Sequence, residues 1–281
     1  LVGIFGDPVD HTISPAMQNA AFEALGLDMA YVPFHVRKSP SCDLKAAVNA
    51  VRALNMRGVN VTIPHKEKVL KYLDEVDPDA KATGAVNTIV NRNGMLVGYN
   101  TDGPGYLLSL KEDIGFTVRG KRIVILGAGG AARAILRSAL EKRPASIVVA
   151  NRTLKRAEDL IREFEASYPV VMKAVGLLDS AIAQDLKNAS LVVNTTSIGM
   201  KGTGAPDVPL EALPRGSVVS DIVYVPLETA FLSAAKARGL RVHYGLSMLV
   251  RQGALTFELW TGKKAPVEVM QRAALACLNL K

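Results

Sequence analysis

Residues 60–67, "NVTIPHKE", combine the pattern of a buried strand with side chains that can form hydrogen bonds. Asn60 and Thr62 alternate with Val61 and Ile63, so an extended chain would place the two polar side chains on one face. We expect the apolar face to look toward the core of a sheet. The opposite face then carries two hydrogen-bonding groups that need partners.

Lys66 stands just past the tip of this strand. Pro64 ends the strand, and the helix expected over 66–76 begins at the lysine. The dipole at a helix N-terminus disfavours an ammonium group, which suits a lysine there to proton transfer. A carboxylate would hold it in position, and Asp102 in "GYNTDG" is a candidate. Spacing alone leaves two interpretations open: a catalytic pair, or a solvated lysine and an aspartate that caps the next helix.

A glycine-rich turn in the second half predicts a dinucleotide site. The segment "RIVILGAGGAARAI" supplies a strand, then Gly127-x-Gly129-x-x-Ala132, then a helix. Such a turn lets backbone N–H groups approach a pyrophosphate at the helix N-terminus. The strand before it and the helix after it are the required context. The alternative is a glycine turn that only packs.

The end of the next strand favours one dinucleotide over another. An NAD site would place Asp or Glu about 20 residues beyond the glycines, whereas this strand ends "NRTLKRAED". Thr153 can cap the helix expected over 154–167, with Lys155 and Arg156 in its first turn and Arg152 ahead of it. Positive charges there oppose the helix dipole, and a 2′-phosphate between the two arginines would compensate. We therefore expect NADP, the alternative being that these side chains only extend into solvent.

Local signals place the elements of the first half. Ser14 is expected to cap a helix over 14–26, with proline at its first position. The segment 86–100 is expected to form a hairpin that turns at Asn93-Gly94.

Strands alternate with helices along the chain, which predicts an α/β fold. A second cycle of strands and helices begins at Lys121, so we expect a domain boundary in the helix near 105–118. Beyond Gly245 only helices follow, and these could return to pack on the first domain.

Composition narrows the class of protein. The chain has 281 residues, 49% of them hydrophobic, and a formal net charge of +8. This charge favours anionic partners, but no run of five like charges or basic-aromatic stretch is present, so nucleic-acid binding is not expected. No apolar run approaches membrane-span length and no leader is recognised, so we expect a cytoplasmic protein without a membrane.

Cysteine and histidine spacing does not suggest a metal site. Cys42 and Cys277 are far apart and do not suggest a disulfide framework. The histidines lack ligand spacing, so we expect no metal; they are His11, His35, His65 and His243.

Sequence blocks in both halves resemble those of the shikimate dehydrogenases. They occur in the order seen in that family and cover nearly the whole chain, which is far more specific than the glycine turn alone. The blocks are "GDPVDHTISPAMQN" (6–19), "GVNVTIPHKE" (58–67), "GAVNT" (84–88), "GYNTDG" (98–103), "LGAGGAARA" (126–134), "NRT" (151–153), "NTTSIGM" (194–200), "DIVYVPLET" (221–229) and "GLSMLVRQGALTFELWTG" (245–262).

The resemblance implies NADPH-dependent reduction of 3-dehydroshikimate to shikimate, a step in aromatic amino-acid synthesis. It implies an α/β substrate domain over 1–105, completed by the C-terminal helices 246–281, and a Rossmann-type NADP-binding domain over 106–245. Lys66 and Asp102 would be the catalytic acid-base pair.

The resemblance also implies the binding residues. At the substrate these are Thr12, Ser14, Asn60, Thr62, Lys66, Asn87, Asp102, Tyr224 and Gln252. Those at the NADP cofactor are Gly127, Ala128, Gly129, Gly130, Ala131, Asn151, Arg152, Thr153, Arg156, Ile222 and Gly245. Thr12 and Ser14 are two apart, so in an extended chain both hydroxyls would point one way, as a carboxylate requires. Asp221 is left outside the expected site.

One departure from the family pattern leaves the choice between shikimate and quinate as substrate undecided. Thr12 stands where serine is usual in "HSxSP", and its extra methyl group narrows the space near the substrate carboxylate. A quinate/shikimate dehydrogenase of broader substrate and cofactor use is therefore the alternative. A non-catalytic protein that senses NADP or shikimate is a third hypothesis, and both monomer and homodimer are compatible with the sequence.

Overall fold

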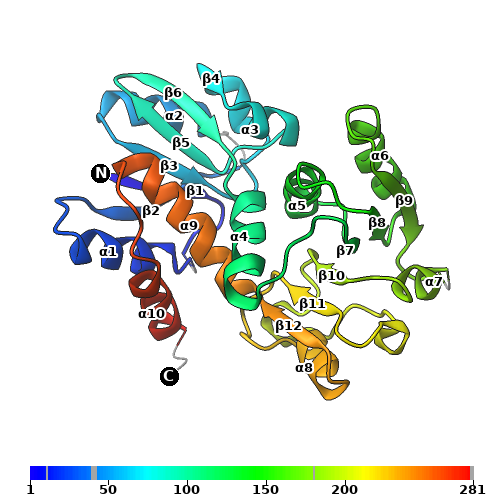
Figure 1. Ribbon diagram of the computed structural model, residues 1–281. Helices are drawn as coiled ribbons and strands as arrows, with labels where there is room; N and C mark the ends of the chain where they lie inside the picture. Colours follow the sequence, from blue (N-terminus) through cyan, green and yellow to red (C-terminus); the bar gives the residue numbers. More distant parts are fainter. Residues whose placement is uncertain (11, 39–42, 180, 279–281) are drawn as a thin grey trace. The chain divides into compact units, whose positions relative to one another are not determined.

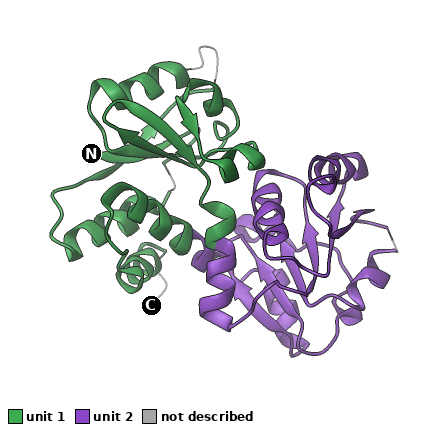
Figure 2. Cartoon of the chain, turned by 45° about the horizontal axis from the view of Figure 1, so that its top comes forward, with its two compact units in different colours: residues 1–105, 250–281 green, residues 106–249 purple. Residues whose placement is uncertain are grey.

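The computed structural model consists of two compact units, Leu1–Gly105 with Val250–Lys281 (unit 1) and Tyr106–Leu249 (unit 2) (Figure 2). The chain passes between them within α4 (Asp102–Ile114) and again within α9 (Gly245–Thr261). His11 and Cys42 lie outside the described residues, which are 1–10, 12–38, 43–179 and 181–278.

Unit 1 contains a six-stranded mixed sheet in the order β2-β1-β3-β5-β6-β4 (Figure 1). β1, β2 and β3 are parallel, whereas β5 and β6 form the predicted antiparallel hairpin, with positive φ at Asn93 and Gly94. The hairpin makes this sheet mixed rather than wholly parallel. Its strands are β1 (Val2–Gly6), β2 (Tyr31–His35), β3 (Gly58–Val61), β4 (Glu75–Val76), β5 (Thr88–Arg92) and β6 (Met95–Tyr99).

The C-terminal helices complete the core of unit 1. Phe22 stacks on Phe257 of α9 with ring centroids 5.3 Å apart, and Trp260 Nε1 donates to the Ile89 carbonyl at 3.0 Å. The last helix, α10, packs against α1. The helices of unit 1 are α1 (Ser14–Ala24), α2 (Leu44–Ala53), α3 (Pro78–Thr83) and α10 (Val267–Cys277), with a 3-10 turn η1 (Lys68–Tyr72).

The expected helix over 66–76 is wrong. Only η1 is helical there, and Glu75–Val76 form the edge strand β4 beside β6. The neighbouring Asp74 carboxylate accepts the Leu96 N–H at 2.7 Å and binds the Arg52 guanidinium at the same distance. These contacts hold the segment against the sheet, so pairing with β6 overrides helix propensity.

Two smaller expectations also fail at strand and helix ends. β3 ends at Val61, and Ile63 is 73% exposed instead of facing the core. The N-cap of α1 is Ile13, and Ser14 is the first helical residue. The hydroxyl that accepts the Ser14 N–H belongs to Thr12, at 3.2 Å.

Unit 2 is a doubly wound Rossmann-type domain. Its six strands are all parallel in the order β12-β11-β10-β7-β8-β9, with the direction of winding reversing between β7 and β10. The strands are β7 (Arg122–Leu126), β8 (Ser146–Asn151), β9 (Val171–Gly176), β10 (Leu191–Asn194), β11 (Val218–Asp221) and β12 (Arg241–Tyr244).

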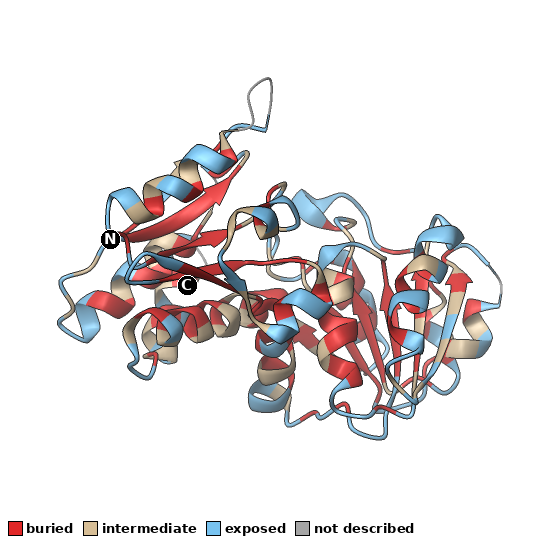
Figure 3. Cartoon of the chain, turned by 90° about the horizontal axis from the view of Figure 1, so that it is seen from above, coloured by how far each residue is buried: buried red, intermediate tan, exposed pale blue. Residues whose placement is uncertain are grey.

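Both faces of the unit 2 sheet are buried. Ile123 and Ile125 of β7 belong to one hydrophobic cluster, and Val124 and Leu126 belong to another. Alternate residues therefore pack into different cores, as expected for a parallel sheet covered on both sides (Figure 3). The covering helices are α5 (Gly130–Leu140), α6 (Leu154–Glu165), α7 (Ile182–Leu186) and α8 (Ala230–Ala237), with the 3-10 turns η2 (Met200–Gly202) and η3 (Leu210–Ala212). Within the described part of the chain, no helix has the length and apolar character needed to cross a membrane.

Candidate active site

Three strand ends meet at one edge of the unit 1 sheet. Lys66 follows β3, Asn87 precedes β5 and Asp102 follows β6. Because β5 runs antiparallel to both neighbours, its amino end lies beside the carboxyl ends of β3 and β6. Residues far apart in the sequence are thus brought to one edge.

Lys66 and Asp102 form an ion pair at this edge. Lys66 Nζ lies 2.6 Å from Asp102 Oδ2, and the two side chains are 28% and 12% exposed. Asp102 is the first residue of α4, and Asn100 Oδ1 accepts its backbone N–H at 3.0 Å. The Asp102 carboxylate is therefore directed to the lysine, and the interpretation of a solvated lysine beside a capping aspartate is wrong. Since η1 begins only at Lys68, the charge that faces Lys66 is this carboxylate and not a helix terminus.

Asn87 orients the Asp102 carboxylate. Its Nδ2 donates to Asp102 Oδ1 at 2.7 Å and lies 2.9 Å from Thr101 Oγ1. Its Oδ1 accepts the Thr101 backbone N–H at 2.8 Å. Because Asn87 is buried and hydrogen-bonded through both ends of its amide, it fixes one carboxylate oxygen and leaves the other for Lys66.

Asn60 belongs to a second, deeper group of polar residues. Its Nδ2 donates to Thr88 Oγ1 at 3.1 Å and its Oδ1 accepts from the Tyr31 hydroxyl at 2.9 Å. Burial raises the pKa of Tyr31, and a hydrogen bond from Ser14 opposes that shift. The amide of Asn60 thus joins β2, β3 and β5 behind the ion pair, and its direct contact with a ligand stays a prediction.

Gln252 and Thr256 bring α9 to the same place. Gln252 Oε1 lies 3.4 Å from Asn87 Nδ2, and Thr256 Oγ1 lies 2.8 Å from Thr88 Oγ1. Thr256 is a site-supporting residue that sequence reasoning missed, together with Tyr31 and Thr101. A signal was available, because residues four apart on a helix share a face and Thr256 is four residues after Gln252.

Thr12, Ser14 and Thr62 follow β1 and β3. Thr12 Oγ1 donates to Ser14 Oγ at 3.1 Å, so the two hydroxyls are adjacent. The expected extended chain is wrong, however, because Ile13 between them has φ -92° and ψ 0° and Ser14 is already helical. Thr62 is half-buried, and a Cβ added at Gly6 would lie 2.5 Å from its methyl carbon. Because Gly6 has no side chain, the Thr62 side chain can pack directly against it.

The glycine turn of unit 2 leaves free space in front of the N-terminus of α5. Gly127 has φ +109°, and a Cβ there would lie 2.7 Å from Thr195 Oγ1, so only glycine fits. Gly129 is the N-cap of α5 and Gly130 its first residue, and a Cβ at either would meet nothing within 4 Å. Ala128 and Ala131, beside them, are half-buried.

The basic cluster after β8 divides into paired and unpaired charges. Lys155 Nζ binds Asp159 Oδ1 at 2.6 Å, so its charge is compensated within α6. Arg152 and Arg156 are exposed, and neither guanidinium has a partner among the described residues. Thr153 occupies the N-cap of α6 but its side chain makes no cap hydrogen bond, contrary to expectation. The adjacent Asn151 Nδ2 donates instead to the Thr153 carbonyl at 2.8 Å.

Ile222 and Gly245 are adjacent in unit 2. A Cβ on Gly245 would lie 2.4 Å from the Ile222 carbonyl oxygen, so the start of α9 can approach only without a side chain. Asp221 holds this turn: its carboxylate accepts from the Val223 N–H at 3.0 Å and the Thr229 hydroxyl at 2.7 Å. Burial raises the pKa of Asp221. Asp221 was not identified from the sequence as a residue that positions Ile222.

Tyr224 lies beyond the strand on which it was expected. β11 ends at Asp221, so Tyr224 belongs to the following loop of unit 2, where it is half-buried. The strand is shorter than expected because the Asp221 carboxylate accepts the Val223 N–H at 3.0 Å, which forms a local turn in place of strand pairing.

The described histidines have separate structural environments. His35 Nε2 lies 2.7 Å from Asp7 Oδ1, and buried His65 Nε2 lies 2.6 Å from the Val36 carbonyl. Burial lowers the pKa of His243 to about 4, and its Nδ1 lies 2.9 Å from Ser220 Oγ. No group of three or more His, Cys, Asp or Glu side chains in the described ranges could hold a metal ion.

Comparison with known proteins finds the same family along both units. Three sequence models match: "Shikimate dehydrogenase substrate binding domain" over residues 4–89, "Shikimate / quinate 5-dehydrogenase" over 109–198, and "Shikimate 5'-dehydrogenase C-terminal domain" over 245–275. A protein of Moorella thermoacetica named shikimate dehydrogenase (NADP(+)) is 49% identical to this chain. The match covers 97% of this chain and 91% of the length of the Moorella protein.

Solved structures agree in fold. Shikimate 5-dehydrogenase of Thermus thermophilus, solved with NADP(H) and shikimate, has a TM-score of 0.86 and 40% identity, covering 98% of each chain. Quinate dehydrogenase of Corynebacterium glutamicum, solved with NAD, has a TM-score of 0.90 and 30% identity, covering 98% of each chain. With matches of this length and identity, which cover both the Rossmann-type unit and the unit that carries the Lys66–Asp102 pair, the chain belongs to the shikimate dehydrogenase family.

Proposed function

We propose that this protein is an NADP-dependent shikimate dehydrogenase, which reduces 3-dehydroshikimate to shikimate and catalyses the reverse oxidation. The observation that carries the proposal is the ion pair of Lys66 Nζ and Asp102 Oδ2 at 2.6 Å, with Asn87 fixing the second carboxylate oxygen at 2.7 Å. This reaction is a biosynthetic step toward aromatic amino acids, and we place it in the cytoplasm.

Lys66 is the acid-base group of the proposed mechanism. In the direction of reduction its ammonium donates a proton to the carbonyl oxygen of the substrate, and in oxidation its amine accepts the proton of the hydroxyl. Asp102 keeps the ammonium directed at that oxygen and stabilises its charge. NADPH supplies the hydride that the carbonyl carbon receives. Each reduction therefore consumes one proton from Lys66, which solvent restores through its exposed side.

Polar side chains of unit 1 suit a hydroxylated carboxylic acid. Thr62, Gln252 and the Lys66–Asp102 pair are proposed to bind ring hydroxyls, with Asn60 and Asn87 predicted beside them. The adjacent hydroxyls of Thr12 and Ser14, 3.1 Å apart, are proposed to bind the carboxylate. The contribution of Tyr224 to the carboxylate stays a prediction.

The features of unit 2 fit NADP. The space in front of α5, where a Cβ at Gly129 or Gly130 would meet nothing within 4 Å, suits a pyrophosphate on the helix N-terminus. The turn from Gly127 to Ala131 would hold it. Asn151, Arg152, Thr153 and Arg156 would hold the ribose and its 2′-phosphate, and Ile222 and Gly245 would line the nicotinamide end.

Steady-state rates test the proposed activity directly. We expect kcat/KM to be highest for shikimate with NADP+ among the four combinations of shikimate or quinate with NADP+ or NAD+. A preference for quinate with NAD+ would instead establish the broader quinate/shikimate enzyme, which the "Shikimate / quinate 5-dehydrogenase" match over 109–198 keeps as the second candidate. Binding of NADP+ and shikimate without turnover would identify a sensor.

Removing the two unpaired arginines should abolish the preference for NADP+. We expect Arg152→Ala/Arg156→Ala to raise KM for NADP+ about tenfold or more, because two charge-assisted contacts to the 2′-phosphate are lost, and to leave KM for NAD+ nearly unchanged. Lys155→Ala is the matched control, since its charge is already paired with Asp159 at 2.6 Å. Equal losses with both cofactors would contradict the assignment.

A further inference from the structure

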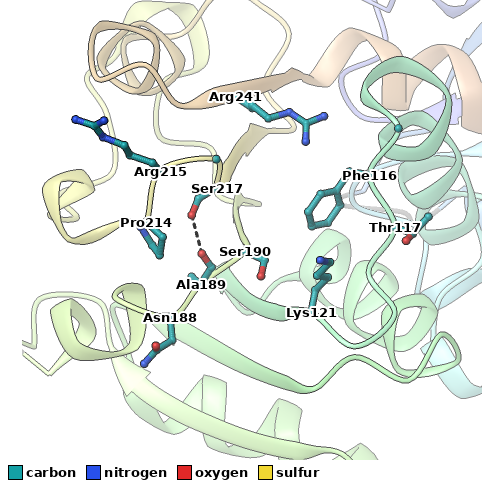
Figure 4. A pocket seen from close by; sticks show the side chains of 12 residues that line it. Phe116, Thr117, Lys121, Asn188, Ala189, Ser190, Pro214, Arg215, Ser217 and Arg241 are labelled. Atoms are coloured by element: carbon teal, nitrogen blue, oxygen red, sulfur yellow. Dashed lines mark hydrogen bonds between the residues drawn. The ribbon is translucent and has the colours of Figure 1, made fainter.

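A hollow opens at the amino edge of the unit 2 sheet (Figure 4). It has a volume of about 440 Å³. Lys121, Ser190 and Ser217 each directly precede a strand that begins there, β7, β10 and β11 respectively, and Arg241 opens β12. The glycine turn follows the carboxyl end of β7, so the hollow lies at the opposite edge of the sheet from the predicted cofactor site.

The hollow carries uncompensated positive charge. The Lys121 ammonium forms no hydrogen bond or ion pair within the described ranges, and none of the described lining residues is acidic. Arg241 donates from Nη2 to the Ile114 carbonyl, which leaves most of its N–H groups available. In Figure 4 the ammonium of Lys121 and the guanidinium of Arg241 lie on the side of Phe116, whereas the guanidinium of Arg215 points away from the other lining side chains.

The remaining lining combines one available hydroxyl with an apolar wall. Ser190 Oγ has no hydrogen-bond partner in the described part of the chain, whereas Ser217 Oγ donates to the Ala189 carbonyl at 2.8 Å. Phe116 lines the hollow as an apolar side chain, although the residue as a whole is only 8% exposed. Binding sites for small organic molecules are roughly 300–1,000 Å³ and combine apolar walls with a few charged groups.

We propose that this hollow binds a small organic anion, whose phosphate or carboxylate oxygens are held by Lys121 and Arg241. The Ser190 hydroxyl donates a further hydrogen bond, and the carbon skeleton packs on Phe116. Lys121 and Arg241 face no acidic residue among the described lining residues, which favours an anionic ligand. The hollow is also larger than a bare inorganic ion, which favours an organic one. The inference is independent of the proposed activity, because none of these residues belongs to the predicted site.

The test titrates the full chain with inorganic phosphate and, separately, with citrate at constant ionic strength. Binding is followed by the amide NMR signals of Gly216 and Ser217, which line the hollow. We expect saturable shifts, and we expect Lys121→Ala to weaken binding about tenfold or more, because a charge-assisted contact is lost. Arg215→Ala is the matched control: it removes the same charge from the rim, and we expect less than about a threefold change, because exposed charges are screened.

The outcomes separate the ligand classes. Saturable shifts with phosphate alone identify a phosphoryl ligand, shifts with citrate alone a polycarboxylate, and shifts with both a site for either group. Absence of saturable shifts with both probes overturns the proposal. So does an equal loss in Lys121→Ala and Arg215→Ala, which would mean that only the general positive field of the rim attracts anions. Lys121→Ala removes no hydrogen bond formed by the described residues, so its fold is expected to be intact.

Discussion

Lys66→Ala is expected to lower turnover by ~10² or more, the usual scale for a lost general acid-base group. Lys66 lies between β3 and η1 with its Nζ 2.6 Å from Asp102 Oδ2, and its carbonyl accepts the Val86 N–H at 2.9 Å. Alanine keeps that backbone contact and removes only one of the proposed substrate contacts, those of Thr62, Gln252 and Asp102 remaining, so binding of shikimate should be largely retained. The measurement is kcat together with the dissociation constant of shikimate.

Lys68→Ala is the control for this substitution. Lys68 begins η1 two residues later, is exposed, and forms no ion pair among the described residues. The same net charge is lost, so near-normal turnover of Lys68→Ala beside a large loss in Lys66→Ala assigns the effect to position 66. Near-normal turnover of Lys66→Ala would remove this lysine from the mechanism.

The Rossmann-type unit was largely predictable because its signals are local. Gly127 must adopt a positive φ directly after β7, and the four residues Ile123 to Leu126 of that strand are all buried. Each feature depends on a few neighbouring residues, a glycine turn and a continuous apolar run, both of which the sequence displays. The hairpin at Asn93-Gly94 was predictable for the same reason, since the turn residues determine it.

The candidate site was less predictable because its contacts join distant parts of the chain. The side chains of Asn87 and Gln252 are 3.4 Å apart but 165 residues apart in sequence, and no periodicity relates them. Spacing left Lys66 and Asp102 with two interpretations. The position of α4 after β6 shows that they form an ion pair, and the catalytic role of that pair stays a prediction. The family resemblance named both residues, but it did not include Thr101, Thr256 or Tyr31, which support them.

Tertiary contacts also explain the local errors. The segment before β4 has helical propensity, yet Asp74 binds Arg52 and the Leu96 N–H and draws the chain to the sheet edge. Ser14 is a good capping residue by type, but the Thr12 hydroxyl already accepts its N–H at 3.2 Å. In each case a side chain outside the expected element decides where that element begins or ends.

Asp102→Asn is expected to lower turnover on the order of 10², close to the effect of losing Lys66, because the two groups act as one unit. The amide can still accept the Asn87 Nδ2–H that now reaches Asp102 Oδ1 at 2.7 Å, so the start of α4 should stay in place. What is lost is the negative charge that directs and stabilises the Lys66 ammonium. The measurement is kcat, with the thermal unfolding temperature as the check that folding is unchanged.

The double variant Lys66→Ala/Asp102→Asn distinguishes a catalytic pair from two independent contributions. If Asp102 acts through Lys66, the carboxylate has no function once the lysine is absent, and the double variant should be only slightly slower than Lys66→Ala. If the two residues act separately, their losses multiply to ~10⁴. A multiplied loss would overturn the assignment of Asp102 as the partner of the lysine, and would require that its carboxylate contact the substrate on its own account.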